Sequence, residues 1–549
     1  MNKNIKILLP ILLSAAIATG LWLGIKINQK VQPARTTSVN YFQPDKLSLL
    51  LRLIEKDYVD SIDQHDVIEQ VIPEILHELD PHSTYIPARE MQAVTEDMRG
   101  NFSGIGVQFV MQNDTVMIVE VLSGGPSKTL GILAGDRIVK VNDRNIAGKE
   151  LPTDSIVSML RGEKNTMVKV SIKRPSFNEL LIFDIKRGEI PIYSIDAAYI
   201  ISDDIGFIKV NRFAESTYRE FVQAVEKLIG MNAQKLIIDL RGNAGGSLQG
   251  VIQMVDEFLP ANQLIVYTEG KARPRNNYNS SQNGQWKEKK VAVLIDEFSA
   301  SASEIFASAI QDNDRGLVIG RRSFGKGLVQ EQIPFLDGSA LRLTVARFYT
   351  PSGRSIQKPY DNGIEEYRSD YRNRIMHNEL SQKDSILLDE NLKYQTLGGR
   401  TVYGGGGIMP DVFVPIDTME VTPFLTAVAA QNLIYHFAFE YTDKNRSSLN
   451  QSAANTAQLV DYLNKERIVE QFVVHTKEKG IEYNHSEFKK SEVLIRTQLH
   501  AYISRNIIGE SGFYEVILED DHTVKKAIEL LKKDKGETLL TATAEEDSM

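Results

Sequence analysis

The chain has 549 residues, which at roughly 100 to 200 residues per domain corresponds to several domains rather than one small core. Its 63 basic and 72 acidic residues leave a net charge of −9, so nucleic acid is excluded as a main partner because no basic surplus can neutralise a phosphate backbone. The 42% hydrophobic and 25% charged residues are typical of a folded globular chain. The absence of cysteine excludes thiolate catalysis, disulfides and cysteine-ligated metal sites.

Residues 1–29 predict a signal anchor. Residues 7–25 are a run of 19 residues without a charge, which is long enough to cross a bilayer core. Lys3 and Lys6 precede the run, so we expect a cytoplasmic N-terminus, with the rest of the chain on the extracytoplasmic, periplasmic side of the inner membrane. A cleavable signal is the alternative; because the apolar run continues through residues 21–25, we favour an uncleaved anchor.

The remaining chain shows four successive patterns. Residues 30–98 are a polar linker followed by a module with apolar residues at helical spacing, and residues 99–188 are a segment of short strands. Residues 189–420 alternate strands with helices and predict an α/β core, and residues 421–549 return to helical periodicity. The strands expected in the core include 205–210, 236–240, 291–295 and 341–345, and the helices 218–230, 247–259 and 301–312.

Ser301 stands where a strand and a short turn lead into an apolar helix. Its main role could be to cap that helix, because Ser301 and Glu304 form an S-x-x-E capping box. A serine nucleophile needs a base, and no histidine lies between residues 205 and 350. Lysine is therefore the candidate base for this serine.

Lys326 lies between Gly325 and Gly327, where glycine permits close approach of another backbone. An exposed turn lysine is the alternative interpretation, and a catalytic one must be buried enough to lose its proton. Gln330, four residues on, lies on the same side of the chain and could orient the amine. The G-x-x-x-x-G-K match at residues 320–326 is not a nucleotide loop, because Gly327 replaces the required Ser or Thr and strand-like residues follow.

A second glycine-rich turn, DLRGNAGG at residues 239–246, follows a predicted strand and precedes a predicted helix. Such a turn presents main-chain N–H groups that can hold a phosphate or an oxyanion, or it can simply connect the two elements.

Six strings resemble the carboxyl-terminal processing (tail-specific) proteases, over roughly residues 40 to 420. They are LDPHSTYIP (79–87), FSGIGVQF (102–109), GDRIVKVN (135–142), DLRGNAGG (239–246), SASASE (299–304) and SFGKGLVQ (323–330). The resemblance implies a multidomain α+β protein with a helical N-terminal module, a PDZ domain, a protease core similar to the ClpP and crotonase folds, and a helical C-terminal region.

The resemblance assigns Ser301 as the nucleophile, Lys326 as the general base and Gln330 as the residue that orients the lysine. It assigns the oxyanion hole to main-chain N–H groups of Ala302 and of Gly246 or Gly245. The implied reaction is peptide hydrolysis through an acyl-enzyme, with no metal, nucleotide or organic cofactor.

The segment 99–188 resembles a PDZ domain, which pairs a peptide with a strand edge and holds its terminal carboxylate. The implied peptide-binding residues are Gly104, Ile105, Gly106, Val107 and Arg161. In the family an arginine equivalent to Arg161 links the PDZ domain to the protease core; here Asn165 replaces the usual glycine before threonine, and asparagine tolerates a left-handed turn.

We therefore predict a membrane-anchored serine endopeptidase that acts on proteins or peptides with exposed apolar C-termini. A catalytically silent PDZ receptor and an acyl-thioester enzyme are the alternative functions. The roles predicted for residues 421–549 are substrate shielding or subunit contact. The partner predictions for the chain are a homodimer or an adaptor protein.

Overall fold

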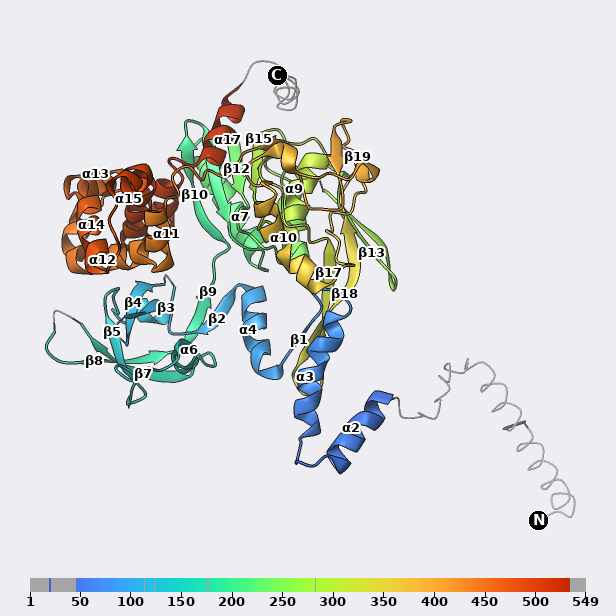
Figure 1. The fold of residues 1–549 in the computed structure, drawn as a ribbon, viewed down its shortest axis with the longest axis horizontal. Coiled ribbons are helices and arrows are strands. Elements are labelled where there is room, and N and C mark those ends of the chain that lie inside the picture. Colours follow the sequence, from blue (N-terminus) through green and yellow to red (C-terminus); the bar gives the residue numbers. More distant parts are fainter. Residues whose placement is uncertain are drawn as a thin grey trace, which may run out of the picture. The chain divides into compact units, whose positions relative to one another are not determined.

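The computed structural model describes residues 19–20, 46–112, 114–122, 124–174, 177–281 and 283–533, and the chain divides into two compact units, residues 1–75 and 76–549 (Figure 1). The anchor expected at residues 7–25 lies outside the described residues apart from 19–20. Among the described residues, no helix combines the length and the apolar character needed to cross a bilayer. The anchor and the periplasmic location stay predictions.

The first unit contains α2 (Lys46–Asp57) and most of α3 (Gln64–His77). Both helices lie where apolar residues recur at helical spacing, as expected. None of the residues of α2 is buried, and the exposed side chains include Leu47, Leu50 and Leu53.

In the second unit, a short segment after α3 joins the protease core rather than a helical module. Residues Thr84–Ile86 form β1, which pairs antiparallel with β18 (Ala340–Tyr349). The sequence analysis placed these residues in the helical segment 30–98, because a three-residue strand is too short to give a periodic pattern. The helix α4 (Ala88–Arg99) then leads to the next domain.

The segment expected to be a PDZ domain is mainly β. Its main sheet has the order β3-β4-β5-β7-β8, β6 pairs with β5, and a separate ribbon joins β2 to β9. Its core includes Ile118, Ile138, Val170 and Ile156, the last from α6. The elements are β2 (Asn101–Gly104), β3 (Val107–Gln112), β4 (Thr115–Val121), α5 (Pro126–Thr129), β5 (Arg137–Val141), β6 (Arg144–Asn145), α6 (Thr153–Leu160), β7 (Met167–Lys173), β8 (Leu181–Lys186) and β9 (Gly188–Pro191).

The α/β core is built on a six-stranded sheet of order β10-β11-β12-β15-β16-β21, in which all pairs except β10–β11 are parallel. A second sheet, β1-β18-β13-β14 with β17 paired to β18, completes the core. The elements are β10 (Ile195–Ser202), β11 (Ile205–Val210), α7 (Thr217–Gly230), β12 (Lys235–Asp239), α8 (Leu248–Asp256), β13 (Leu264–Gly270), β14 (Arg273–Asn279), β15 (Lys290–Ile295), α9 (Ala302–Asp312), β16 (Leu317–Gly320), β17 (Leu328–Pro334), α10 (Ile364–Met376), β19 (Lys393–Gln395), β20 (Thr401–Tyr403) and β21 (Val412–Phe413).

Both faces of the six-stranded sheet are covered. Ile208 and Ile238 belong to the cluster formed with α7, α8 and α9, whereas their neighbours Phe207 and Ile237 belong to the cluster that includes α17 (His522–Lys532). Adjacent residues of a strand point to opposite faces, so a strand buried on both sides reads as a continuous apolar run. Helix α17 therefore packs on the protease core.

Five C-terminal helices form their own cluster around residues such as Phe437, Phe472 and Leu499. These helices are α11 (Pro423–Ala430), α12 (Leu433–Ser452), α13 (Thr456–Lys465), α14 (Ile468–Glu478) and α15 (His485–Ile508). Helix α16 (Glu510–Ile517) instead packs through Tyr514 and Ile517 against the same core cluster as α17. The helical C-terminal region expected from periodicity is confirmed.

Candidate active site

Three loops meet at one edge of the sheet. They follow the neighbouring parallel strands β12, β15 and β16, whose carboxyl ends lie at the same edge. The Ala300 N–H donates to the Asn243 carbonyl (3.0 Å), and the Phe324 N–H donates to the Ser299 carbonyl (3.0 Å). The glycine turn, the serine turn and the lysine loop are thus joined by main-chain hydrogen bonds.

Ser301 occupies the N-cap position of the buried helix α9. Its backbone has φ 55° and ψ −111°, a conformation that non-glycine residues rarely adopt. Such a conformation costs about 1 to 3 kcal/mol and persists only where the surroundings hold it.

Glu304 holds this turn. Its carboxylate accepts from the N–H of Ser301 (2.8 Å), the hydroxyl of Ser323 (2.6 Å) and the N–H groups of Gly325 (2.7 Å) and Lys326 (2.9 Å). The S-x-x-E pattern therefore predicted the contact to Ser301, but the same fully buried carboxylate also binds the loop that carries Lys326. Glu304 connects the serine turn to the lysine loop.

Lys326 lies in the loop before β17, and its Nζ donates to Gln330 Oε1 at 3.2 Å. Burial lowers the pKa of Lys326, the positive charge of Arg342 lowers it further, and the carboxylates of Glu304 and Asp80 act in the opposite direction. The net direction favours the uncharged amine. The expected proximity of lysine and glutamine is confirmed.

The glycines beside Lys326 meet other main chains as expected. A Cβ at Gly325, where φ is +90°, would lie 3.1 Å from Gly407 N, and one at Gly327 would lie 3.0 Å from Gln357 N. The chain continues into β17 instead of a helix, which contradicts a nucleotide loop.

The glycine turn lies against Ser301. At Gly245, where φ is +100°, a Cβ would come within 2.7 Å of Ser301 Cβ and 2.9 Å of Ala302 N. The Gly245 N–H donates to Asn243 Oδ1 at 2.9 Å. By contrast, the N–H groups of Gly246 and Ala302 have no acceptor among the described residues.

His82 and Asp80 were not predicted as site residues, because they lie outside the α/β segment 205–350 in which the candidate base was expected. Burial, and then the charge of Lys326, lower the pKa of His82 to about 4, and His82 Nε2 lies 2.7 Å from the hydroxyl of Tyr367. Asp80 accepts from the Ser83 hydroxyl at 2.6 Å. The string LDPHSTYIP contains both residues and was the available signal.

The strand edge of the PDZ domain is open, because β3 is the terminal strand of its sheet. The preceding loop contains Ile105 and Gly106, whose N–H groups have no acceptor among the described residues. Gly106 has φ +77°, and a Cβ there would lie 2.9 Å from Gly125 Cα, so the tight loop requires glycine. The left-handed conformation expected at Asn165 is confirmed by its φ of 73°.

Arg161 follows α6 and contacts the segment that leads into the domain. Its Nη1 lies 3.4 Å from Glu96 Oε2 of α4, and its guanidinium lies 4.4 Å from the centre of the Phe102 ring.

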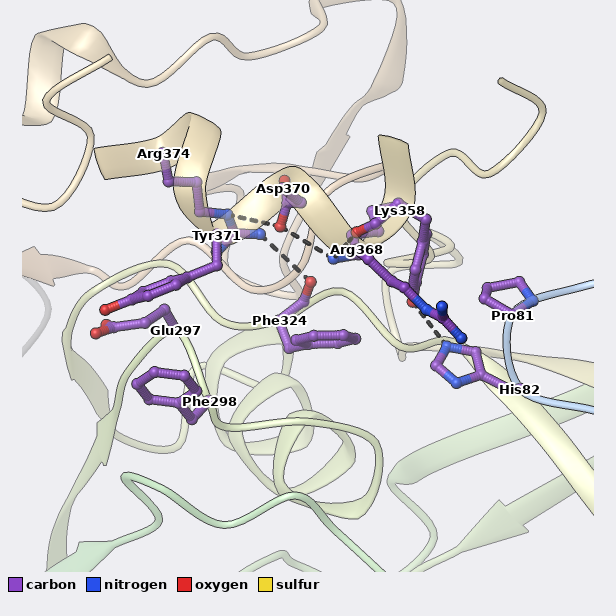
Figure 2. A pocket seen from close by; sticks show the side chains of 11 residues that line it. Pro81, His82, Glu297, Phe298, Phe324, Lys358, Arg368, Asp370, Tyr371 and Arg374 are labelled. Atoms are coloured by element: carbon purple, nitrogen blue, oxygen red, sulfur yellow. Dashed lines mark hydrogen bonds and ion pairs between the residues drawn. The ribbon is translucent and has the colours of Figure 1, made fainter. Parts of the chain in front are cut away.

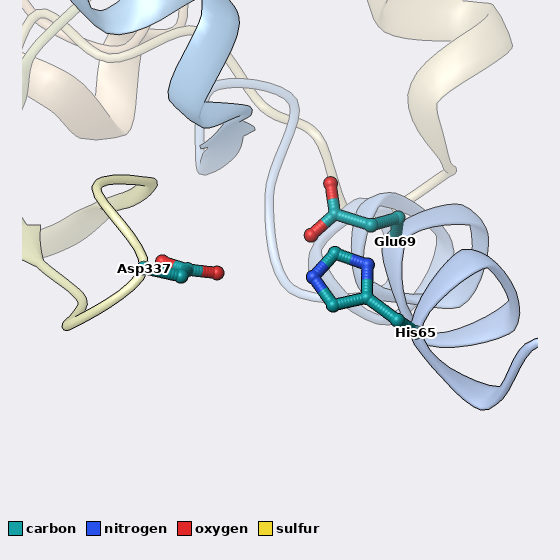
Figure 3. Close-up of side chains that lie close together, drawn as sticks. All are labelled: His65, Glu69 and Asp337. Carbon is teal, nitrogen blue, oxygen red and sulfur yellow. The ribbon is translucent and has the colours of Figure 1, made fainter.

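Polar side chains that lie outside these loops are drawn in Figure 3. His65 and Glu69 are four residues apart on α3 in the first unit, and Asp337 belongs to the second. Two side chains of one helix offer too few ligands for a structural metal ion, so we assign no metal role to them.

The arrangement defines a class of protein, a serine-type peptidase with a PDZ domain. Residues 204–366 match the model of Peptidase family S41, residues 103–185 match a PDZ domain, and residues 424–509 match a family of unknown function, DUF8443.

The chain belongs to the family of carboxy-terminal processing proteases. It is 32% identical to carboxy-terminal processing protease CtpB of Bacillus subtilis (strain 168) over 357 residues, which are 63% of this chain and 73% of the relative. It is 33% identical to the carboxy-terminal-processing protease of Bartonella bacilliformis over 321 residues, 58% of this chain and 73% of the relative. A solved photosystem II D1 C-terminal processing protease is 24% identical, with a TM-score of 0.33 and coverage of 56% of this chain and 88% of that one.

Proposed function

We propose that this peptidase cleaves protein substrates with a dyad of Ser301 and Lys326 and selects them by an exposed C-terminal tail held in its PDZ domain. The observation that carries the dyad is the partly buried amine of Lys326, held by Gln330 in a loop that shares the Glu304 carboxylate with the Ser301 turn. A lysine can act as a base when burial favours its uncharged amine. A serine becomes a nucleophile when such a base accepts the proton of its hydroxyl.

In the proposed reaction, neutral Lys326 takes the proton of the Ser301 hydroxyl as Oγ attacks the peptide carbonyl carbon. The N–H groups of Ala302 and Gly246 donate to the oxyanion, and Gly245 is disfavoured as a donor because its N–H already binds Asn243. The resulting ammonium protonates the leaving amine, the C–N bond breaks, and an acyl-enzyme remains. Lys326 then deprotonates water, whose attack releases the new carboxyl terminus and restores Ser301.

The PDZ domain is suited to a free C-terminus. The N–H groups of Ile105 and Gly106, which have no acceptor in the described part of the chain, can donate to a carboxylate. The open edge of β3, which begins at Val107, can pair with the preceding residues of a peptide. Gly106, at φ +77°, allows the main chain to turn tightly at that point, whereas Gly104 belongs to the strand β2.

The experiment that tests this function compares one polypeptide with a free apolar C-terminus and the same polypeptide with an amidated C-terminus. We expect amidation to lower kcat/KM about 10-fold or more, because the hydrogen bonds to a charged acceptor are lost. Ser301→Ala should bind the free form without cleaving it. Equal cleavage of both forms contradicts tail capture, and binding without cleavage by the wild type favours the silent PDZ receptor.

We further propose that tail binding is coupled to the active site through α4. Arg161 contacts Glu96 of this helix, and the next residue, Asp97, pairs with Arg212 at 2.6 Å. The residue after Arg212, Phe213, donates its N–H to the Gly245 carbonyl at 3.0 Å. A movement of the PDZ domain can thus reach the proposed oxyanion turn through contiguous contacts.

Reversal of the Arg161–Glu96 pair tests this coupling. Arg161→Glu places two carboxylates together and is expected to change kcat/KM for a tail-bearing substrate about 5- to 10-fold, within the usual range of coupling between sites. Adding Glu96→Arg restores the opposite charges and should bring the rate back toward that of the wild type. Single and double variants with identical rates would disprove the coupling.

A further inference from the structure

A cavity of about 300 Å³ lies between α10 and the turns that precede Ser301 and Lys326 (Figure 2). Phe298 and Tyr371 lie at one end of it, His82 and Arg368 at the other, and Phe324 between them. Phe298 is three residues before Ser301, and Phe324 is two residues before Lys326. The cavity therefore borders both turns that carry the proposed dyad.

One end of the cavity has an aromatic surface that is not covered. The rings of Phe298 and Tyr371 are 5.1 Å apart at their centres, and these residues remain 48% and 40% exposed. Two large rings left exposed beside a buried core are a suitable site for an apolar side chain, which gains free energy when it leaves water.

Cations outnumber anions around the cavity. Lys358 and Arg374 share the carboxylate of Asp370, each at 3.0 Å. The side chain of Arg368 on the rim is 61% exposed and forms a long, exposed ion pair of 3.7 Å with Glu365. The other lining carboxylate, Glu297, is paired outside the lining with Arg321 at 2.8 Å.

The buried cation of the cavity wall is already bound. Lys358 Nζ lies 4.0 Å from the centre of the Phe324 ring and 4.1 Å from that of Tyr367, in addition to its contact with Asp370. Among the described residues that line the cavity, the carboxylates of Glu297 and Asp370 are already paired with cations, so neither can receive a basic side chain, and the excess positive charge repels one.

We propose that this cavity receives a bulky apolar side chain of the substrate next to the scissile bond and disfavours lysine and arginine there. The inference rests on the proposed dyad for the position of the bond. It adds a second element of selectivity, because the tail held by the PDZ domain and the side chain beside the cleaved bond are recognised at separate places.

Peptides that differ at one position test the proposal. Each carries the same free apolar C-terminus, and Phe, Leu, Ala, Asp or Lys is placed in turn at each position flanking the cleaved bond; kcat/KM follows from product quantification. At one of these positions we expect Phe and Leu to exceed Ala about 10- to 100-fold, the scale of apolar pocket discrimination, and Lys to fall below Ala.

Three variants test which residues cause the preference at the position flanking the cleaved bond. Phe298→Ala should reduce the Phe-to-Ala ratio about 10-fold, and Arg368→Glu should raise the Lys-to-Ala ratio. Phe177→Ala is the matched control, since Phe177 is also 48% exposed but lies in the PDZ segment, and it should leave both ratios unchanged. A flat wild-type profile, or equal profiles for the two phenylalanine variants, would overturn the proposal.

Binding measurements separate this proposal from the dyad. The affinity of the Phe, Ala and Lys peptides is measured for Ser301→Ala and for Ser301→Ala combined with Phe298→Ala. If the wild type cleaves nothing but binds the Phe peptide more tightly through Phe298, the dyad fails and the cavity assignment stands. If the wild type cleaves every peptide equally and the Ser301→Ala variants bind all peptides with equal affinity, the cavity assignment fails and the dyad stands.

Discussion

Replacing Lys326 by methionine is expected to lower kcat/KM for peptide cleavage by about 10³-fold or more, because the variant has no group to take the proton of Ser301. Lys326→Arg should lose as much activity, since a guanidinium stays protonated in proteins. The loss in Lys326→Met should not add to that in Ser301→Ala, because the two groups act as one unit. The measurement is kcat/KM for each single variant and for the double variant.

The pH dependence of the wild type gives an independent test of the same residue. Because burial lowers the pKa of Lys326, kcat/KM is expected to rise with pH as the amine loses its proton and to level off below the ordinary lysine pKa of about 10.4. Lys271→Met, an exposed lysine between β13 and β14, is the control and should keep both the rate and the profile. Substantial cleavage by Lys326→Met would refute the dyad.

The same pKa direction makes a prediction about stability. A lysine whose pKa is lower in the folded than in the unfolded state binds fewer protons when folded, so its contribution to stability is full above the unfolded pKa and is lost as pH falls through the folded pKa. At neutral pH the protonated amine therefore destabilises the folded state, and Lys326→Met removes this destabilisation. The inactive variant is therefore expected to have a higher Tm than the wild type, whereas Lys271→Met is not.

Replacing Glu304 by alanine is expected to lower the free energy of unfolding by about 3 to 5 kcal/mol, because it leaves three main-chain N–H groups and the Ser323 hydroxyl without their acceptor. Activity should fall with it, since the unusual backbone of Ser301 depends on this support. Urea denaturation gives the free energy of unfolding, and an unchanged m-value would show that the cooperative transition is kept.

Two further variants show whether the effect depends on the charge and on the buried position of Glu304. Glu304→Gln keeps the shape but turns an amide group toward donors, so an intermediate loss of stability is expected. Glu331→Gln changes an exposed glutamate of β17 that is paired with Arg273, and little change is expected because exposed ion pairs contribute little. A stable, fully active Glu304→Ala would show that the carboxylate does not organise the two turns.

Local features of the site were readable from the sequence. Strand 205–210 depends on neighbouring residues, as does the S-x-x-E contact between Ser301 and Glu304. Gln330 was predicted to lie beside Lys326 because residues four apart lie on the same side of the chain in either a helix or a strand, and the hydrogen bond confirms their proximity. Periodicity, turn chemistry and capping act over a few residues, so sequence alone can predict them.

Other features depend on residues far apart in the chain. The contact of His82 with Tyr367 spans 285 positions, and the second role of Glu304, as acceptor for the lysine loop, spans 22. The cavity beside Phe298 exists only because α10 packs near that turn, and β1 exists only because β18 offers it an edge. No local pattern encodes such pairings, because burial and hydrogen bonding between distant segments arise only when the strands have taken their order in the sheets.

The sequence by itself thus determined the class of protein, the order of its domains and the candidate serine, lysine and glutamine. The tertiary structure alone decided which glycine N–H group beside Ser301 has no acceptor among the described residues, which carboxylate joins the two turns, and where an apolar side chain can enter. The physical reason is that residue type and spacing specify the chemistry available to a side chain. The order of the parallel strands, whose carboxyl ends lie at one edge of the sheet, specifies which of these side chains come together in one site.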